Sequence, residues 1–195
     1  ALLDTNNTSM LTASSNLSVA GTTNNLTLTS GGKITFGNTT VTNNLLSTTR
    51  GVGVLGGVTQ SSGTSLTVTG TSVFTAYVGT GQSAVLTESD NDFGGAVSFA
   101  GTNNGSWVDI TLVDQNSLTL DDVTATGDLD ATAEDDVMLV GTIGADTLDM
   151  TATTGMIDQT AGTLTVTTGP TNLDAGTIIT LDKTNDFNGT VNVLG

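Results

Sequence analysis

The stretch SLTLDDVTATGDLDATAEDDVMLVGTIGADTLDM, residues 117–150, decides the expected fold. Short apolar–polar–apolar triplets begin at Leu118, Leu129, Val137 and Leu148, with spacings of 11, 8 and 11 residues. In a β-strand, successive side chains point to opposite faces, so each triplet buries its first and third residues and exposes its middle one. Two short strands therefore recur every 19 residues. That recurrence is typical of a parallel β-solenoid.

Similar triplets continue along most of the chain, from Leu17–Val19 to Val191–Val193, with Gly, Asn, Asp, Ser or Thr between them. Leu26 and Leu45 are again 19 residues apart. Coils of about 20 residues that stack at about 4.8 Å give about ten coils and a rod about 45–50 Å long. We therefore predict an all-β, parallel β-solenoid (β-helix) with about 20 residues per coil and a narrow apolar core.

Repeated β-sandwiches are the alternative architecture. Sandwich strands usually run to five or six residues and are joined by hairpins, whereas these triplets are shorter and more evenly spaced. A membrane barrel needs strands of about 9–11 residues and aromatic girdles, and aromatic residues make up only 4% of this chain. The pattern favours the solenoid and leaves the sandwich open.

Composition excludes several kinds of chemistry. The 195 residues include no Cys and no His, which rules out disulfides, Cys or His zinc sites, thiol nucleophiles and a Ser-His-Asp relay. No apolar run approaches the length of about 18 residues that a membrane helix needs, so we expect no membrane insertion. The apolar share of 36% is low for one compact core and suits a thin, elongated one.

The net charge of −16 is unevenly distributed. Up to Thr87 the acid Asp4 stands against Lys33 and Arg50, whereas the remainder carries 18 acids and Lys183. Nucleic acid is a poor partner, because phosphate contacts need Lys and Arg. Cations are better partners, and the acidity also keeps a β protein with open edges soluble.

The chain contains a duplication. Val58–Gly70, VTQSSGTSLTVTG, is repeated as Ile157–Gly169, IDQTAGTLTVTTG, and each copy is followed by the phrase Asn-Asp-Phe. We interpret residues 1–195 as one elongated repeat array. Residues 58–156 form one full unit, 157–195 begin the next, and 1–57 are poorly matching N-terminal coils.

The repeated phrases resemble the repeats of filamentous-haemagglutinin-like giant bacterial surface proteins, which are exported by autotransporter or two-partner routes. The resemblance covers Val58 to Gly195 and implies a right-handed β-helix, secretion, and adhesion or surface coating, without naming a ligand. In the later copy its positions are Gln159, Gly162, Leu164, Val166, Ile179, Leu181, Asn185, Asp186, Phe187, Gly189, Val191 and Val193. In the earlier copy they are Gln60, Gly63, Leu66, Val68, Val85, Leu86, Asn91, Asp92, Phe93, Gly95, Val97 and Phe99.

Carboxylates supply the candidate site residues. Calcium takes six or more oxygen ligands from converging groups, and a coil can bring separate acidic clusters together. The alternative is structural: Asn and Asp cap turns through side-chain-to-backbone bonds, Phe fills the core and Gly makes the turn. The candidate calcium ligands are Asp90, Asp92, Asp121, Asp122, Glu134, Asp135, Asp136, Asp182 and Asp186.

The expected function is non-catalytic. A polysaccharide-acting enzyme on a β-helix is the third choice, because lyase-type sites need clustered cations to stabilise developing negative charge. Outward Thr pairs such as Thr165 and Thr167 give way to Asp in other coils, which argues against ice binding. We expect an extracellular or cell-surface stalk, coat or adhesin with no cofactor other than the candidate calcium. Its partners would be neighbouring repeats, a further copy, or a host-surface or glycan ligand. A self-assembling filament subunit, joined through open strand edges, is the alternative.

Overall fold

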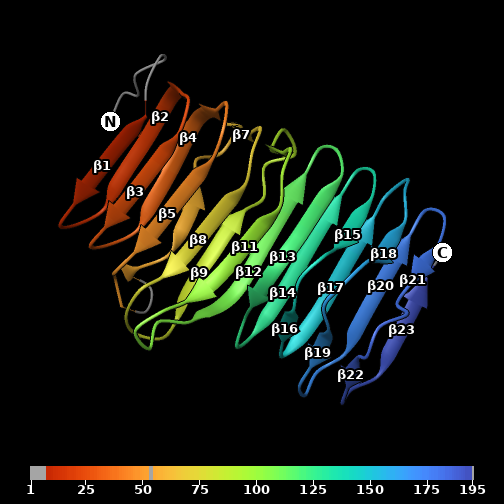
Figure 1. The fold of residues 1–195 in the computed structure, drawn as a ribbon. Coiled ribbons are helices and arrows are strands. Elements are labelled where there is room, and N and C mark those ends of the chain that lie inside the picture. The colour runs from red at the N-terminus through yellow and green to blue at the C-terminus, as the bar shows by residue number, and fades with distance from the viewer. Residues whose placement is uncertain (1–7, 53–54, 195) are drawn as a thin grey trace.

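The computed structural model describes residues 8–52 and 55–194, so Asp4 lies outside the described residues. The chain forms a parallel β-solenoid of about nine turns, about 20 residues apart, with almost no helix. Figure 1 shows the coils stacked along one axis, from the red N-terminal end to the blue C-terminal end. No helix within residues 8–52 and 55–194 is long and apolar enough to cross a membrane.

The strands form two long sheets, and strands that lie side by side come from successive coils. Sheet 1 contains twelve strands: β1 (Ser9–Ala13), β3 (Leu26–Ser30), β5 (Leu45–Thr49), β8 (Ser72–Ala76), β11 (Val97–Gly101), β13 (Leu118–Thr124), β15 (Val137–Leu139), β16 (Ile143–Ala145), β18 (Ile157–Gln159), β19 (Leu164–Val166), β21 (Ile179–Thr180) and β22 (Asp186–Phe187). Sheet 2 contains eleven: β2 (Leu17–Thr23), β4 (Ile34–Val41), β6 (Val58–Gln60), β7 (Leu66–Val68), β9 (Gln82–Leu86), β10 (Asp92–Phe93), β12 (Trp107–Asp114), β14 (Asp128–Ala133), β17 (Thr147–Ala152), β20 (Thr171–Ala175) and β23 (Val191–Leu194).

Every strand pair among the described residues is parallel. Leu118 pairs with Val137, and Leu129 with Leu148, so the 19-residue period of the sequence is the register of the sheets. The solenoid prediction is confirmed. The sandwich alternative is wrong, because hairpins would have made neighbouring strands antiparallel.

Some coils divide one long strand into two shorter ones. The first half of β4 pairs with β6 and its second half with β7, and β13 pairs in the same way with β15 and β16. In the coil after β4, the duplicated phrase Val58–Gly70 spans both short strands and the turn between them.

The core is a continuous apolar column between the sheets. Inward positions such as Leu26, Leu120 and Leu148 are fully buried, as the alternation of the triplets predicts. Aromatic side chains gather in the middle of the rod, where the rings of Phe74 and Phe99 stack with centroids 4.8 Å apart and Trp107 meets Phe99 edge-on at 5.5 Å. These rings bury a large apolar area in the middle coils.

Candidate functional site

The two copies of the repeat form the same partly buried side-chain contact. In the first copy, Gln60 Nε2 donates to Asn91 Oδ1 over 2.7 Å, and Asn91 Nδ2 donates back to Gln60 Oε1 over 2.9 Å. In the second copy, Gln159 and Asn185 exchange the same two bonds at 2.8 Å each. A side-chain amide carries both donors and an acceptor, so two facing amides satisfy each other. We call Gln60–Asn91 and Gln159–Asn185 the amide clamps.

Each clamp also holds the start of a strand. Asn91 Oδ1 accepts the backbone N–H of Leu66 over 2.9 Å, and Asn185 Oδ1 accepts that of Leu164 over the same distance. In both copies the Asn comes from the coil that follows the strand it caps. The clamps therefore tie one coil to the next through side chains, in addition to the backbone ladder.

The residues after the clamp Asn serve the core and the stacking. Phe93 is buried in the first copy, and Phe187 is half-buried against the core in the second. The interpretation that the Asn caps a turn and the Phe fills the core is therefore confirmed. The glycines are required for a different reason from the turn geometry that the sequence predicted. Gly95 and Gly189 do not have positive φ values. A Cβ on either would collide with the backbone of the preceding coil, at Gly70 and Gly169.

A buried carboxyl group lies directly beside the first clamp. Asp114 is only 2% exposed. Its Oδ2 accepts the N–H of Phe93 over 2.8 Å, and its Oδ1 accepts that of Asn116 over 2.7 Å. Burial raises the pKa of Asp114 to about 6, against the opposing effect of these two bonds, and the nearby charge of Asp92 raises it further. Asp114 therefore titrates where ordinary carboxyls are already ionised.

This titration makes the fold less stable as the pH rises. The folded pKa of Asp114 lies above its ordinary value of 3.8, so its stabilising contribution is complete below that pH and is lost as the pH passes about 6. A shift of this size corresponds to about 3 kcal/mol, and solvent screening reduces the expected change to about 2 kcal/mol. The measurement is urea unfolding of wild type and Asp114→Asn between these two pH values. The difference between the two proteins should change with pH, and a constant difference would contradict the assignment.

The turns show a second recurring contact, in which a side-chain oxygen accepts a backbone N–H of the next coil. In the first half the acceptors are Asn side chains: Asn38 receives the N–H of Ser65 over 3.0 Å and Asn44 that of Thr71 over 2.9 Å. In the second half Asp does the same work. The acceptors there are Asp109 for Asp128 at 3.1 Å, Asp122 for Thr142 at 2.9 Å and Asp136 for Met156 at 2.9 Å.

The two acidic clusters expected to approach each other lie apart. Glu134, Asp135 and Asp136 stack at the start of β13, where the N–H groups of Asp135 and Asp136 bond Asn116 and Ser117. Asp121 and Asp122 lie in the second half of β13, beyond Leu120, and approach Gly141 of the next coil closely. The strand segment Leu118–Leu120 separates the two clusters.

The other candidate ligands are also dispersed. Asp90 is exposed in the turn before β10, and Asp92 lies within β10. Asp182 forms an ion pair with Lys183 at 2.6 Å, and Asp186 lies in β22 opposite Thr165. In residues 8–52 and 55–194, no group of three carboxylates is arranged to hold a metal ion. Calcium binding stays a prediction.

A triple substitution tests the two explanations of the turn carboxylates together. Asn fills the same role in the first half, so Asp109→Asn, Asp122→Asn and Asp136→Asn combined should change the free energy of unfolding by no more than about 0.5 kcal/mol per site. Melting is measured with and without millimolar calcium. A calcium-dependent rise in the melting temperature of the wild type, absent in the triple variant, would establish a calcium site. No rise in either protein would remove it.

The outward Asp residues that replace Thr in other coils form an acidic column on the outer face of sheet 2, an arrangement that the sequence did not predict. Asp130 and Asp149 are register partners on adjacent strands, and Asn172 donates to Asp149 from the next strand over 2.5 Å. Desolvation, followed by the charges of Asp149, Asp128 and Asp109, raises the pKa of Asp130. The 19-residue spacing of Asp130 and Asp149 is the signal that could have revealed this column.

Parallel ladders on one continuous core, with clamps that recur in the duplicated phrase, define the class: this is a β-solenoid repeat protein. The model of a family described as repeats of unknown function (DUF5649) matches residues 23–100, 108–144 and 137–194. The chain therefore belongs to this family. Comparison with curated proteins and with solved structures gave no match. The unit boundaries at residues 58–156 and 157–195 stay a prediction.

Proposed function

We propose that the chain is a non-catalytic structural and adhesive segment of a bacterial surface or secreted protein. The observation that carries this proposal is the unbroken pair of parallel ladders through about nine turns, tied together by the amide clamps. A ladder of this kind resists bending, because each coil is bonded to both neighbours along its whole length. Such a rod suits a spacer or coat that presents long side-chain columns to a partner.

Location outside the cell is supported by the resemblance of the repeated phrases to filamentous-haemagglutinin-like surface proteins. The absence of Cys from the chain is compatible with an oxidising environment, because no stray disulfide can form. Antibodies raised against residues 58–194 test the location on cells of the source organism. Labelling of intact cells is the expected result. Labelling only after permeabilisation would overturn the proposal.

A filament subunit is the second candidate, favoured by the inner side chains of the last described coil. The inward-facing Val191 and Val193 of β23 are 42% and 60% exposed, and β23 pairs only with β20 among the described strands. An open strand edge over an apolar face accepts a further parallel strand. That strand comes either from a following segment of the same polypeptide or from the first coil of a second copy.

Light scattering after size-exclusion chromatography distinguishes these two sources for the 195-residue chain. Stacking of copies predicts a molar mass that rises with protein concentration. Val193→Lys should abolish the rise, because it places a charge on the open face. Leu46→Lys is the matched control, since Leu46 is also exposed but lies on the outer face of sheet 1. A monomer at every concentration would exclude the filament.

A further inference from the structure

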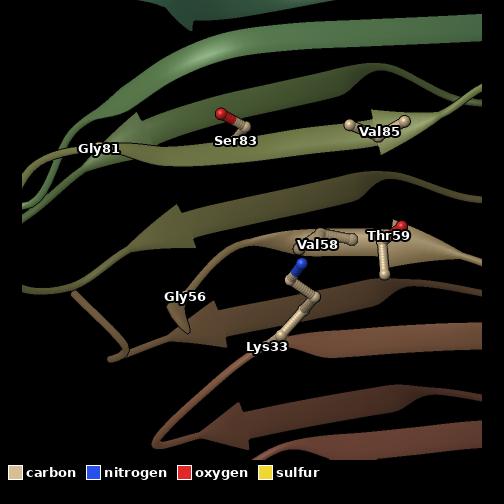
Figure 2. A pocket seen from close by; sticks show the side chains of 7 residues that line it. All are labelled: Lys33, Gly56, Val58, Thr59, Gly81, Ser83 and Val85. Atoms are coloured by element: carbon tan, nitrogen blue, oxygen red, sulfur yellow. The ribbon is translucent and has the colours of Figure 1, made fainter. Parts of the chain in front are cut away.

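A small depression lies on the outer face of sheet 2, where β4, β6 and β9 begin. Figure 2 shows the Lys33 side chain reaching across it toward β6, with the Thr59 side chain on β6 and those of Ser83 and Val85 on β9. The space holds about 140 Å³, and the backbone at Gly56 and Gly81 contributes to its lining. It is separate from the amide clamps and from the acidic column.

The hollow is built into the backbone. Ile34, Val58 and Ala84 are register partners on β4, β6 and β9. The residues just before them, Lys33, Gly57 and Ser83, therefore follow one another on three successive coils. Gly57 has a φ of +97°, which disfavours any residue with a side chain, and a Cβ there would collide with the Ser83 carbonyl oxygen. The middle position of the three therefore has no side chain, and the Lys33 side chain lies over the space that this leaves.

The charge of Lys33 is not neutralised by the protein around it. Among the described residues the one ion pair joins Lys183 to Asp182, and Arg50 lies 4.2 Å from the centroid of the Tyr77 ring. In the following coil, the row of Lys33, Gly57 and Ser83 continues with the acid Asp109. Asp109 accepts the backbone N–H of Asp128 from the coil beyond it, on the side away from Lys33. Three strand spacings, about 14 Å, separate Lys33 from Asp109. That distance exceeds the screening length of about 8 Å at physiological salt.

We propose that this depression binds the carboxylate-bearing ring of a uronic acid in an acidic polysaccharide. The Lys33 ammonium pairs with the sugar carboxylate in a charge-assisted bond. The hydroxyls of Thr59 and Ser83 both donate and accept, so they match the sugar hydroxyls, and Val85 offers an apolar surface to the C–H face of the ring. This assignment rests on the adhesive part of the proposed function and names the ligand class for it.

Titration of the isotope-labelled chain with glucuronate, followed by NMR, tests the site. Saturable shifts are expected at the amides of Gly57 and Ser83, with weaker binding as salt increases. Lys33→Gln should weaken binding about tenfold or more, the loss of one charge-assisted bond. Lys183→Gln is the matched control, because it removes the other lysine, and it should bind as the wild type does.

Three outcomes would overturn the assignment. Glucose binding as tightly as glucuronate would show that the charge of Lys33 is not used. Inorganic sulfate binding as tightly would show recognition of an anion without a sugar. Equal losses in Lys33→Gln and Lys183→Gln would place the ligand elsewhere. Failure here leaves the surface location intact, because labelling of intact cells with antibody does not depend on any ligand.

Discussion

Replacement of Asn91 by Ala is expected to lower the free energy of unfolding by about 3–4 kcal/mol. The substitution removes the acceptor of the Leu66 N–H and the donor to Gln60 Oε1, whereas Gln60 Nε2 keeps its bond to the Thr64 carbonyl. Each unsatisfied buried group costs about 1–3 kcal/mol. The effect should be larger than that of an ordinary surface substitution, because the lost side chain bonds two coils at once. Urea unfolding, followed by Trp107 fluorescence, measures the change.

Two variants serve as controls for this prediction. Asn38→Ala removes an exposed turn acceptor that receives a single N–H, and should cost less than about 1 kcal/mol. Asn91→Asp keeps the oxygen that caps Leu66 but loses the donor to Gln60, so it should fall between the two. Equal losses for Asn38→Ala and Asn91→Ala would show that the clamp adds nothing beyond a turn contact.

Trp107→Ala should cost about 4–5 kcal/mol, within the range for a buried Trp replaced by Ala. The Trp107 side chain is fully buried, contacts Phe99 edge-on at 5.5 Å and donates through Nε1 to the Ala100 carbonyl over 3.1 Å. Its removal leaves a cavity in the middle of the rod and loses this hydrogen bond. Calorimetry combined with far-UV circular dichroism measures the loss without relying on the indole.

Trp107→Phe is the control for the cavity. Phe retains most of the ring volume and loses the hydrogen bond, so it should cost about 1–2 kcal/mol. If Ala and Phe destabilise the protein equally, the hydrogen bond and not the packing dominates at this position. If neither changes the unfolding transition, the aromatic cluster is not a stabilising centre of the core.

The strands and their period could be predicted from the sequence because both depend on local alternation. The spacing between Leu118 and Val137 reports the register directly, since each coil contributes one rung to the ladder. The parallel direction follows from the same repeat. The number of coils was also close, at about ten expected against about nine found.

The contacts that join coils were harder to predict. Gln60 and Asn91 are 31 residues apart, and both letters were visible in the duplication, but their pairing depends on how the intervening turns fold. Asp121 and Asp136 were expected near each other because a coil could close between them. The register instead places Asp136 just before Val137, the partner of Leu118, and Asp121 just after Leu120, so the paired segment lies between them. Asp114 carried no pattern, since a single acid at the end of a strand is common.

The interchange of Asn and Asp at the turns allows the surface charge of the rod to vary independently of its fold. Asn44 and Asp122 both receive a backbone N–H from the following coil at 2.9 Å, so the backbone accepts either residue. Mutation can therefore change the surface charge of individual coils from neutral to acidic while the backbone fold stays the same. In this architecture, solubility and the tendency to associate can change during evolution, or be engineered, without any change to the residues of the core.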